Sequence, residues 1–523
     1  MKKIRRNFMS GLYLFVLLMI IEVLLVIIIQ FLLDNILQAI GASNEWIYLI
    51  WTLIRLVESI FVIVLYHKIL NRAEDPEFKI AWLIFLLIIP LFTAFVYIVF
   101  GNHGISKKEE RVVELSRATY FPYLKAQHKA NQDKEANLGR GLGAFNYIRN
   151  TTGMGFHSHN HIEYYKNGET FFPAFIDALK EAQEFIFIEF FIITDGKEWT
   201  AVKDILIEKA KQGVEVRLVY DDLGCAGTIS PRTPKKLRKY GIKCFKFHKF
   251  KPFLHRSYNN RTHRKIVVVD HKYAFTGGIN LADEYANEIV RFGYWKDTMI
   301  RIEGSAISNL ITTFLQDYDL CAKSPSDYNK YLDYQYPQFE DEGYISPFGD
   351  GPGGIDNALV GEQNYINILN YAQKRVDIST PYLVCTYKLL DALRNAALRG
   401  VEVNLILPGI PDKKLVYKFA KSNFPFLLEA GVNIYLYTPG FNHMKSALAD
   451  NELGFVGTIN FDFRSLVHHF ECGATLYKVP CLNEIHEDFE EMISVSQKVP
   501  TDFKLGLWSR FVCAILKLFF PLL

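Results

Sequence analysis

The sequence predicts an α/β protein with two duplicated domains, each a mixed sheet flanked by helices, related by a pseudo-twofold axis and preceded by N-terminal transmembrane helices. Two observations predict the duplication. The pattern H-x-K-x4-D occurs twice, and the tetrapeptide Gly-Val-Glu-Val occurs at 213–216 and again at 400–403. Long apolar segments near the N-terminus predict the membrane part, because about 20 apolar residues cross a bilayer core.

Three apolar segments, residues 11–33, 46–66 and 80–100, have about the length of a membrane span. We therefore expect a multi-pass membrane region over residues 1–105. A cleaved signal peptide is the alternative for the first segment, but its apolar stretch is too long and no small-residue cleavage site follows. Basic residues just after the third segment conflict with a three-span topology, so the side of the membrane that holds the remaining chain stays open.

Ionisable residues lie inside these apolar segments. Glu22 is near the middle of the first segment, and Arg55 and Glu58 are near the middle of the second. Ionisable groups at bilayer depth are costly unless they face a partner or water. We therefore expect Glu22 and Arg55 to pair across a helical hairpin, the alternative being a second segment that lies at the interface.

The rest of the chain has the order helix, strand, helix, strand in each half, over residues 170–220 and again over 362–407. This order predicts βαβ units, with parallel strands flanked by helices. The expected organisation is a linker at 106–150, a first domain at 151–325, a connection at 326–360, a second domain at 361–500 and a C-terminal interfacial amphipathic helix at 501–523. An ordinary helix packed on the domain is the alternative for the last segment.

The repeated motif supplies the candidate catalytic residues, which are His263, Lys265, Asp270, His443, Lys445 and Asp450. An Asn follows each His by 17 residues, Asn280 in the first copy and Asn460 in the second. Side chains alternate faces along a strand, so each His and its Lys share one face while the Asp points to the other. We therefore expect His and Lys to share a ligand, and each Asp to anchor a turn or neighbouring backbone.

Two imidazoles, two ammonium groups and two amides suit the chemistry of a phosphodiester. One neutral His can attack phosphorus to give a phosphohistidine, and the other can donate a proton to the leaving oxygen and then act as base. The Lys residues, with Asn280 and Asn460, are expected to hold the non-bridging oxygens, and no metal or other cofactor is required. An imidazole needs an acceptor on its far nitrogen. The candidates are Asp297 and Glu471, which lie 34 and 28 positions beyond the His of their own half.

These residues resemble the phospholipase D superfamily, whose members carry the double motif and use a phosphohistidine intermediate. The segments GGINLADEY, GTINFDFRS and STPYLV are similar to those of bacterial cardiolipin synthases, and the double-motif resemblance covers residues 160–475. It implies transfer of a phosphatidyl group from one phosphatidylglycerol to another in the cell membrane, with release of glycerol, and it supports Asp297 and Glu471 as His partners. The departures are Ala449, Cys225 and an additional apolar segment, none of them at a candidate catalytic position.

Other functions remain as alternatives. A phospholipase D-type hydrolase, or a phosphatidyltransferase with another donor or acceptor, fits the same residues. A membrane-anchored scaffold is disfavoured because both His-Lys pairs and both Asn are present. The net charge of +3 is too small to indicate nucleic acid as a partner, and the basic run at 235–265 is either a solvated face or an approach for anionic headgroups. The seven Cys lack zinc spacing and are expected to be free thiols.

Overall fold

The computed structural model describes residues 24, 27–41, 43–72, 76–101, 104–249, 259–352 and 358–517. The chain divides into two compact units. The first is Met1–Asn102 with Lys517–Leu523, and the second is His103–Leu516, which holds both copies of the motif.

In the first unit, one described helix has the length and apolar character of a membrane span. This is α2 (Asn44–Leu70), whose 27 residues extend over roughly 40 Å. Most of its apolar side chains are exposed, as in a helix that faces lipid. A shorter apolar helix covers Ile27–Ala39. The expected first span lies largely outside the described residues, and so does Glu22, so the expected pair with Arg55 has no structural description.

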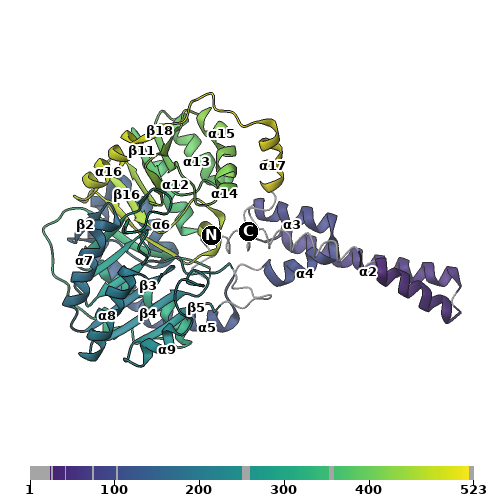
Figure 1. Ribbon diagram of the computed structural model, residues 1–523, viewed down its shortest axis with the longest axis horizontal. Helices are drawn as coiled ribbons and strands as arrows, with labels where there is room; N and C mark the ends of the chain where they lie inside the picture. Colours follow the sequence, from purple (N-terminus) through teal and green to yellow (C-terminus); the bar gives the residue numbers. More distant parts are fainter. Residues whose placement is uncertain are drawn as a thin grey trace. The chain divides into compact units, whose positions relative to one another are not determined.

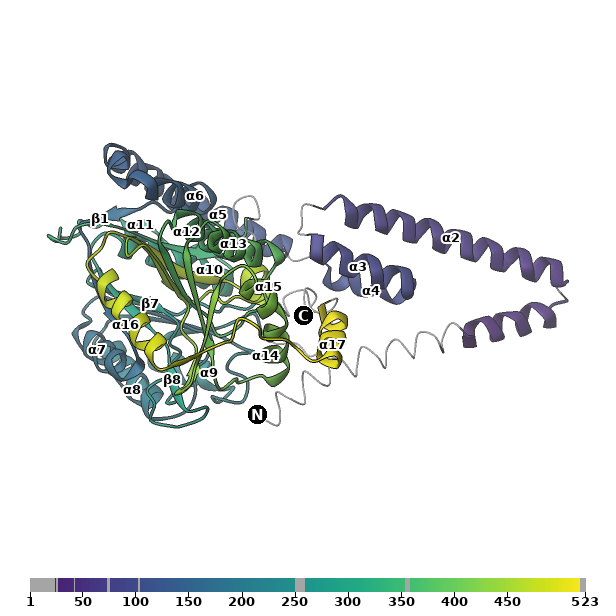
Figure 2. The same cartoon turned by 90° about the horizontal axis from the view of Figure 1, so that it is seen from above.

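The third apolar segment does not form the single helix that the sequence predicted. It forms α3 (Pro76–Ile88) and α4 (Pro90–Phe100), because Pro90 lacks the N–H that would continue the first helix. The rings of Trp82 and Tyr97 lie 5.2 Å apart, whereas 15 residues of straight helix rise roughly 22 Å. α3 and α4 therefore fold back on one another, as Figure 2 shows, and each is shorter than a bilayer core.

The first half of the second unit folds around a seven-stranded sheet (Figure 1). In sheet order the strands are β2 (His161–Tyr165), β9 (Met299–Glu303), β7 (Tyr273–Gly277), β6 (Ile266–Val269), β3 (Phe185–Phe190), β4 (Glu215–Asp221) and β5 (Lys243–Phe247). Strands β3, β4 and β5 are parallel, which confirms the predicted βαβ unit, and the other strands pair antiparallel. The strand of the first motif, β6, lies at the centre of the sheet.

The second half folds around a nine-stranded sheet that repeats this order. Its strands are β1 (His157–Ser158), β10 (Tyr344–Asp350), β17 (Glu471–Tyr477), β16 (Leu453–Gly457), β15 (Ser446–Ala449), β11 (Arg375–Ser379), β12 (Glu402–Pro408), β13 (Asn433–Tyr437) and β18 (Ser496–Lys498). Strands β11, β12 and β13 are parallel, and the motif strand β15 pairs antiparallel with β11, as β6 does with β3. The mixed sheets and their shared order confirm the predicted duplication.

Helices cover the sheets, and strand alternation decides which core each side chain enters. On β3, Ile186 and Ile188 pack with the helices α7 (Gly168–Glu181) and α8 (Lys197–Lys211), while Phe187 packs on the other face with α10 (Ile307–Ala322). Further helices of the two halves are α9 (Thr233–Arg238), α11 (Asn329–Leu332), α12 (Val360–Tyr371), α13 (Tyr387–Leu398), α14 (Lys414–Ala420), α15 (Phe424–Leu428) and α16 (Leu482–Ser494). Figure 1 shows α7 and α8 beside the first sheet and α12 and α13 beside the second.

The segment expected to be a linker is folded. It forms α5 (Lys107–Asn131), a 3₁₀ stretch (Gln132–Gly141) and α6 (Leu142–Thr152). Leu124 and Ile148 are completely buried, and the Ser116 hydroxyl donates to the Asp319 carboxylate of α10 at 2.6 Å. The polar composition that suggested a linker belongs to the exposed faces of these helices, so the prediction for this segment is corrected.

The C-terminal amphipathic segment forms α17 (Leu507–Lys517). Its exposed apolar side chains are Leu507, Trp508, Phe511 and Ile515, which are 82%, 72%, 58% and 45% exposed. Cys513 is buried, and its Sγ lies 3.8 Å from the carbonyl of Lys418 in α14. One side of the helix therefore packs on the domain through Cys513, and the four exposed apolar side chains form a stripe on its outer side. The rest of the segment predicted to be this helix, residues 518–523, lies outside the described residues.

Candidate active site

The two motif histidines lie just ahead of strands β6 and β15, where the two halves of the unit join. Strand β8 (Tyr294–Lys296) of the first half pairs in parallel with β14 (Gly440–Asn442) of the second. The backbone N–H of His443 donates to the carbonyl of Lys296 at 2.7 Å, and that of His263 donates to the carbonyl of Phe470 at 2.7 Å. Each motif histidine is therefore anchored to the backbone of the opposite half.

The same crossing occurs at the side chains. Nδ1 of His263 lies 2.9 Å from Oε2 of Glu471, and Nδ1 of His443 lies 2.5 Å from Oδ2 of Asp297. Each acid thus pairs with the histidine of the other half, not with the one that precedes it in its own half. Because Nδ1 faces the carboxylate, Nε2 is the ring nitrogen of each histidine that is left for a substrate.

The motif lysines lie beside their histidines. Nζ of Lys265 donates to the carbonyl of His263 at 2.7 Å. Nζ of Lys445 contacts the carbonyl of His443, lies 2.6 Å from Nδ1 of the same ring, and lies 3.5 Å from Oδ2 of Asp297. Both lysine side chains are completely buried. Two buried ammonium groups at the junction make it a site for an anion.

Burial controls the ionisation of the histidines and acids. Burial lowers the pKa of His263 to about 3 and that of His443 to about 4, against the opposing attraction of their carboxylate partners. Burial would raise the pKa of Asp297, but the positive charge of Lys445 and the contact with His443 outweigh it and lower that pKa. The pKa of Glu471 is likewise lowered by His263, against the effect of burial. Both acids are therefore carboxylates, and both imidazoles are neutral near pH 7.

The lysines have lowered basicity as well. Burial lowers the pKa of Lys265 to about 7, although Glu471 opposes the shift. Burial also lowers the pKa of Lys445 to about 8, against the opposing attraction of Asp297 and Glu471. An incoming phosphodiester carries negative charge, which favours the protonated form of both side chains.

The motif aspartates bind backbone. The carboxylate of Asp270 accepts hydrogen bonds from the N–H groups of residues 183–185 at 2.7–2.9 Å, and that of Asp450 accepts from residues 373–375 at 2.8–3.0 Å. Both aspartates have a left-handed backbone, with φ of 51° and 52°. These are the backbone contacts that the alternation along the motif predicts. Each aspartate ties the turn after its motif strand to the start of the neighbouring antiparallel strand, β3 in the first half and β11 in the second.

The two motif asparagines differ in their contacts. Oδ1 of Asn280 accepts from the N–H of Ile192 at 3.0 Å, and its Nδ2 donates to Oη of Tyr285 at 2.6 Å. The side-chain carbonyl of Asn460 is buried and has no hydrogen-bond partner among the described residues. The amide of Asn280 is therefore engaged by the protein, whereas the amide of Asn460 has an open acceptor.

Several residues of the site were not predicted from the sequence. The hydroxyls of Ser465 and Thr458 donate to the two oxygens of Glu471, at 2.6 Å and 2.5 Å, and fix the carboxylate. The ring of His469 lies 5.6 Å from that of His263. Three rings surround His443 at 5.5–5.7 Å, those of Tyr285, Trp295 and Phe441. The pair His468-His469 directly before Phe470-Glu471 was the signal in the sequence that could have pointed to the second imidazole.

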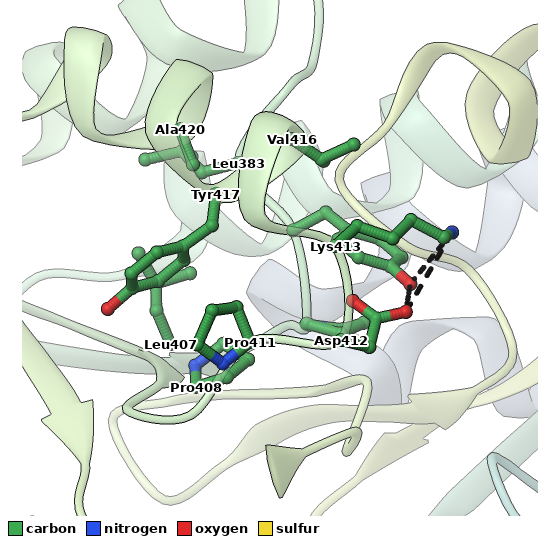
Figure 3. A pocket seen from close by; sticks show the side chains of 11 residues that line it. Leu383, Leu407, Pro408, Pro411, Asp412, Lys413, Val416, Tyr417 and Ala420 are labelled. Carbon is green, nitrogen blue, oxygen red and sulfur yellow. Dashed lines mark hydrogen bonds and ion pairs between the residues drawn. The ribbon is translucent and has the colours of Figure 1, made fainter. Parts of the chain in front are cut away.

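A small cavity lies beside the segment STPYLV in the second half, and Figure 3 shows its lining. Oη of Tyr382 donates to Asp412 at 2.8 Å, and Nζ of Lys413 donates to Oη of Tyr382 at 3.1 Å. The remaining lining is mostly apolar, and the cavity volume is about 10 Å³, near that of one water.

Comparisons with known proteins agree with this fold. Residues 175–316 and 365–493 match the family described as "Cardiolipin synthase, PLD-like domain", and residues 46–102 match "Phospholipase_D-nuclease N-terminal". An uncharacterised protein of Streptococcus mutans is 38% identical over 87% of this chain and 98% of its own length. Cardiolipin synthase 2 of Bacillus anthracis is 33% identical over 86% of this chain and 88% of its own length.

A crystal structure of phosphatidylserine synthase from Haemophilus influenzae shares the fold, with a TM-score of 0.53 and 14% identity over 73% of this chain and 97% of that chain. The duplicated mixed sheets and the paired motifs at their junction are those of a phospholipase D-like enzyme. The chain belongs to the cardiolipin synthase family with phospholipase D-like domains, and as a member of it the protein is a phosphatidyltransferase.

Proposed function

We propose that this enzyme transfers a phosphatidyl group from one phosphatidylglycerol molecule to another, giving cardiolipin and glycerol. One observation carries the proposal. Each motif imidazole is hydrogen-bonded to a carboxylate of the opposite half, at 2.9 Å and 2.5 Å, so two Nε2 atoms are available to a single phosphodiester. Membership of the cardiolipin synthase family supports the choice of lipid.

In the first half-reaction, Nε2 of His263 attacks phosphorus and the bond from phosphorus to the glycerol oxygen breaks. His443 donates its proton to that oxygen, so glycerol leaves as a neutral alcohol. The bound phosphate charge favours protonation of His443 before this step. The products are a phosphatidyl-histidine at His263 and a neutral His443.

In the second half-reaction, His443 takes the proton from a glycerol hydroxyl of a second phosphatidylglycerol. The resulting oxygen attacks phosphorus, and the bond from phosphorus to His263 breaks. Cardiolipin forms, and both histidines return to their starting state. Asp297 and Glu471 orient the rings and stabilise the imidazolium that forms on either one.

The charge that gathers on the non-bridging oxygens needs stabilisation by nearby donors. We assign this role to Lys265 and Lys445, both buried beside their histidines. Asn460 is the better placed of the two asparagines, because the Nδ2 of Asn280 would first have to release its hydrogen bond to Oη of Tyr285. Asp270 and Asp450 support the motif strands through backbone contacts.

The enzyme is proposed to act at the bacterial cell membrane as a multi-pass protein. The span candidate α2 and the preceding apolar segment 11–33 would anchor the chain. The exposed stripe of α17 would lie in the interface plane. A site held against lipid and sheltered from bulk water favours an alcohol over water as acceptor.

The test is turnover by purified full-length protein in vesicles that contain labelled phosphatidylglycerol alone. Cardiolipin together with an equal amount of free glycerol is the expected result. Phosphatidic acid would identify a hydrolase, and turnover only with another added lipid would identify a different donor or acceptor. No product with any lipid would overturn the proposal, provided that the protein's unfolding curve shows it to be folded.

A further inference from the structure

Glu471 has a second imidazole beside it. Nδ1 of His469 lies 3.5 Å from Oε1 of Glu471, while Nδ1 of His263 lies 2.9 Å from Oε2. The ligand atoms that these three residues offer all lie within 4.8 Å of one another. At 3.5 Å the contact with Glu471 is long for a hydrogen bond, and Nδ1 of His469 has no other hydrogen-bond partner in the described part of the chain. This nitrogen has no role in the proposed reaction.

Two imidazole nitrogens and one carboxylate oxygen are a donor set that binds Zn²⁺ in proteins, with a fourth position left open. Bond lengths near 2.1 Å place the ligand atoms of a tetrahedral ion roughly 3.4 Å apart. The contacts of His263 and His469, at 2.9 Å and 3.5 Å, run to different oxygens of Glu471, and the three ligand atoms lie within 4.8 Å of one another. Binding through one of these oxygens therefore requires side-chain shifts of roughly 1 Å.

The carboxylate of Glu471 is oriented by hydrogen bonds, as carboxylates that bind metals usually are. The hydroxyls of Ser465 and Thr458 donate to its two oxygens, which is the outer-shell support that orients metal-binding carboxylates. The side chain of His469 is 12% exposed, compared with 6% for His263 and none for Glu471. An ion can therefore reach the cluster from the side of His469.

We propose that His263, His469 and Glu471 form a binding site for a divalent transition-metal ion of the zinc type. An ion on Nδ1 of His263 leaves the proton of the neutral ring on Nε2, so Nε2 has no lone pair to attack phosphorus and turnover stops. That consequence rests on the proposed function, whereas metal binding itself does not. The ion acts as an inhibitor, and the transfer reaction proceeds without it.

The opposite half lacks the third ligand. The backbone N–H groups of His263 and His443 donate to Phe470 and Lys296, so the residues before these, His469 and Trp295, occupy equivalent positions. The ring of Trp295 lies 5.7 Å from His443, much as His469 lies 5.6 Å from His263. An indole offers no metal ligand. The duplication is therefore broken at this position, and one site is expected per chain.

The charges around the cluster are mixed. The donor set carries the single negative charge of Glu471, which attracts a cation. Lys265 and Lys445 interact electrostatically with Glu471 and oppose a bound ion. Asp221, which interacts with His469, is paired with Arg261 at 2.9 Å and contributes little net charge.

The experiment uses full-length protein in detergent, purified without a polyhistidine tag and treated with chelator. Titration with Co²⁺ is expected to give one equivalent with the visible absorption of a tetrahedral ion, and Zn²⁺ should displace it. The variant His469→Asn should bind about 100-fold more weakly or worse, because a direct ligand contributes more than an outer-shell partner. Trp295→Phe, at the equivalent position, should bind as the wild type does.

Two further readouts separate the possible outcomes. Zn²⁺ should protect both His263 and His469 from acylation by diethyl pyrocarbonate. Because this measurement uses the wild type, its result does not depend on how any variant folds. Zn²⁺ should inhibit phosphatidylglycerol turnover at concentrations that fill the site, and His469→Asn should resist it. Unchanged Co²⁺ binding in that variant, or no protection of the two histidines, overturns the site. Metal binding by a protein that turns over no lipid would keep the site and reject the proposed function.

Discussion

The carboxylate of Asp297 lies 2.5 Å from Nδ1 of His443, although the two residues are 146 positions apart in the chain. The matching contact, between Glu471 and His263, spans 208 positions. An ionised carboxylate keeps a proton on the nitrogen that it faces and leaves the lone pair of Nε2 for chemistry. Each half of the protein therefore orients the reactive imidazole of the other half.

Replacing Asp297 by Asn should lower the turnover number by roughly 10²–10⁴-fold, the usual contribution of an oriented acid or base. The amide can donate to Nδ1 and so stabilise the wrong tautomer. Glu471→Gln should behave similarly through His263. Turnover of labelled phosphatidylglycerol measures the loss, and an unchanged unfolding midpoint serves as the control. A loss of less than about threefold in both variants would remove the orienting role.

A substrate with a good leaving group, such as a p-nitrophenyl phosphatidyl ester, should distinguish the roles of the two histidines. His443→Asn should still form the covalent intermediate, because such a group leaves without a proton, and should then stall for lack of a base. His263→Asn should form no intermediate. Trapping the labelled phosphoprotein and locating the label by mass spectrometry gives the answer. Label on His443 in the His263→Asn variant would reverse the assigned roles.

Acid should destabilise the fold through the buried histidines. Burial lowers the pKa of His263 to about 3 and that of His443 to about 4, whereas histidine in an unfolded chain titrates near 6.5. Between these values the unfolded chain binds more protons, so stability falls as the pH drops from about 6.5 towards 4, by about 1.4 kcal/mol per pH unit for each group.

The measurement for this effect is denaturant unfolding in micelles between pH 4.5 and 7.5, compared between wild type and His443→Asn. The variant should lose stability with falling pH less steeply, by about 1.4 kcal/mol per unit. Parallel pH profiles would show that His443 is protonated in the folded state across this range.

Asp450→Ala should weaken the fold more than the chemistry. The substitution leaves three backbone N–H groups, those of residues 373–375, without their acceptor. Water can replace part of this loss because the carboxylate is only half-buried, so we expect about 2 kcal/mol of destabilisation. Turnover by the fraction that remains folded should change by less than about tenfold. Full stability together with abolished turnover would instead place Asp450 in the reaction itself.

The stripe of α17 should enter lipid. A solvatochromic label on Phe511→Cys should shift to the blue and be quenched by lipid-borne quenchers when the full-length protein is placed in vesicles. The same label on Arg510→Cys, the next residue along the helix, is the matched control and should remain in water. Equal quenching at the two positions would argue against an in-plane orientation.

Much of this architecture could be predicted from sequence because it follows short-range periodicity. The parallel strands β3 and β4, the duplication and the backbone role of Asp270 all follow from alternation along strands and from matched spacing. The acids Asp297 and Glu471 were also anticipated. Their crossed pairing was not, because it depends on which half packs against which, and no local pattern encodes that.

Other features depended on single residues or on three-dimensional contacts. The break at Pro90 divides an apolar stretch that hydropathy alone treats as one span. Asn280 has the same spacing as Asn460, yet its amide is taken up by Ile192 and Tyr285, contacts that spacing does not reveal. His469 was not predicted as a site residue, because its proximity to His263 arises only in the folded chain.

The crossed carboxylates also constrain how such a chain can evolve. A polypeptide with a single copy of the motif would have to borrow its acid from a second molecule, so the ancestral unit is expected to have worked as a symmetric dimer. Fusion placed both partners on one chain and freed the two halves to diverge, as Trp295 and His469 have done. Asp297 and Glu471 differ in length but both keep a carboxylate, because losing either would affect the histidine of the opposite half.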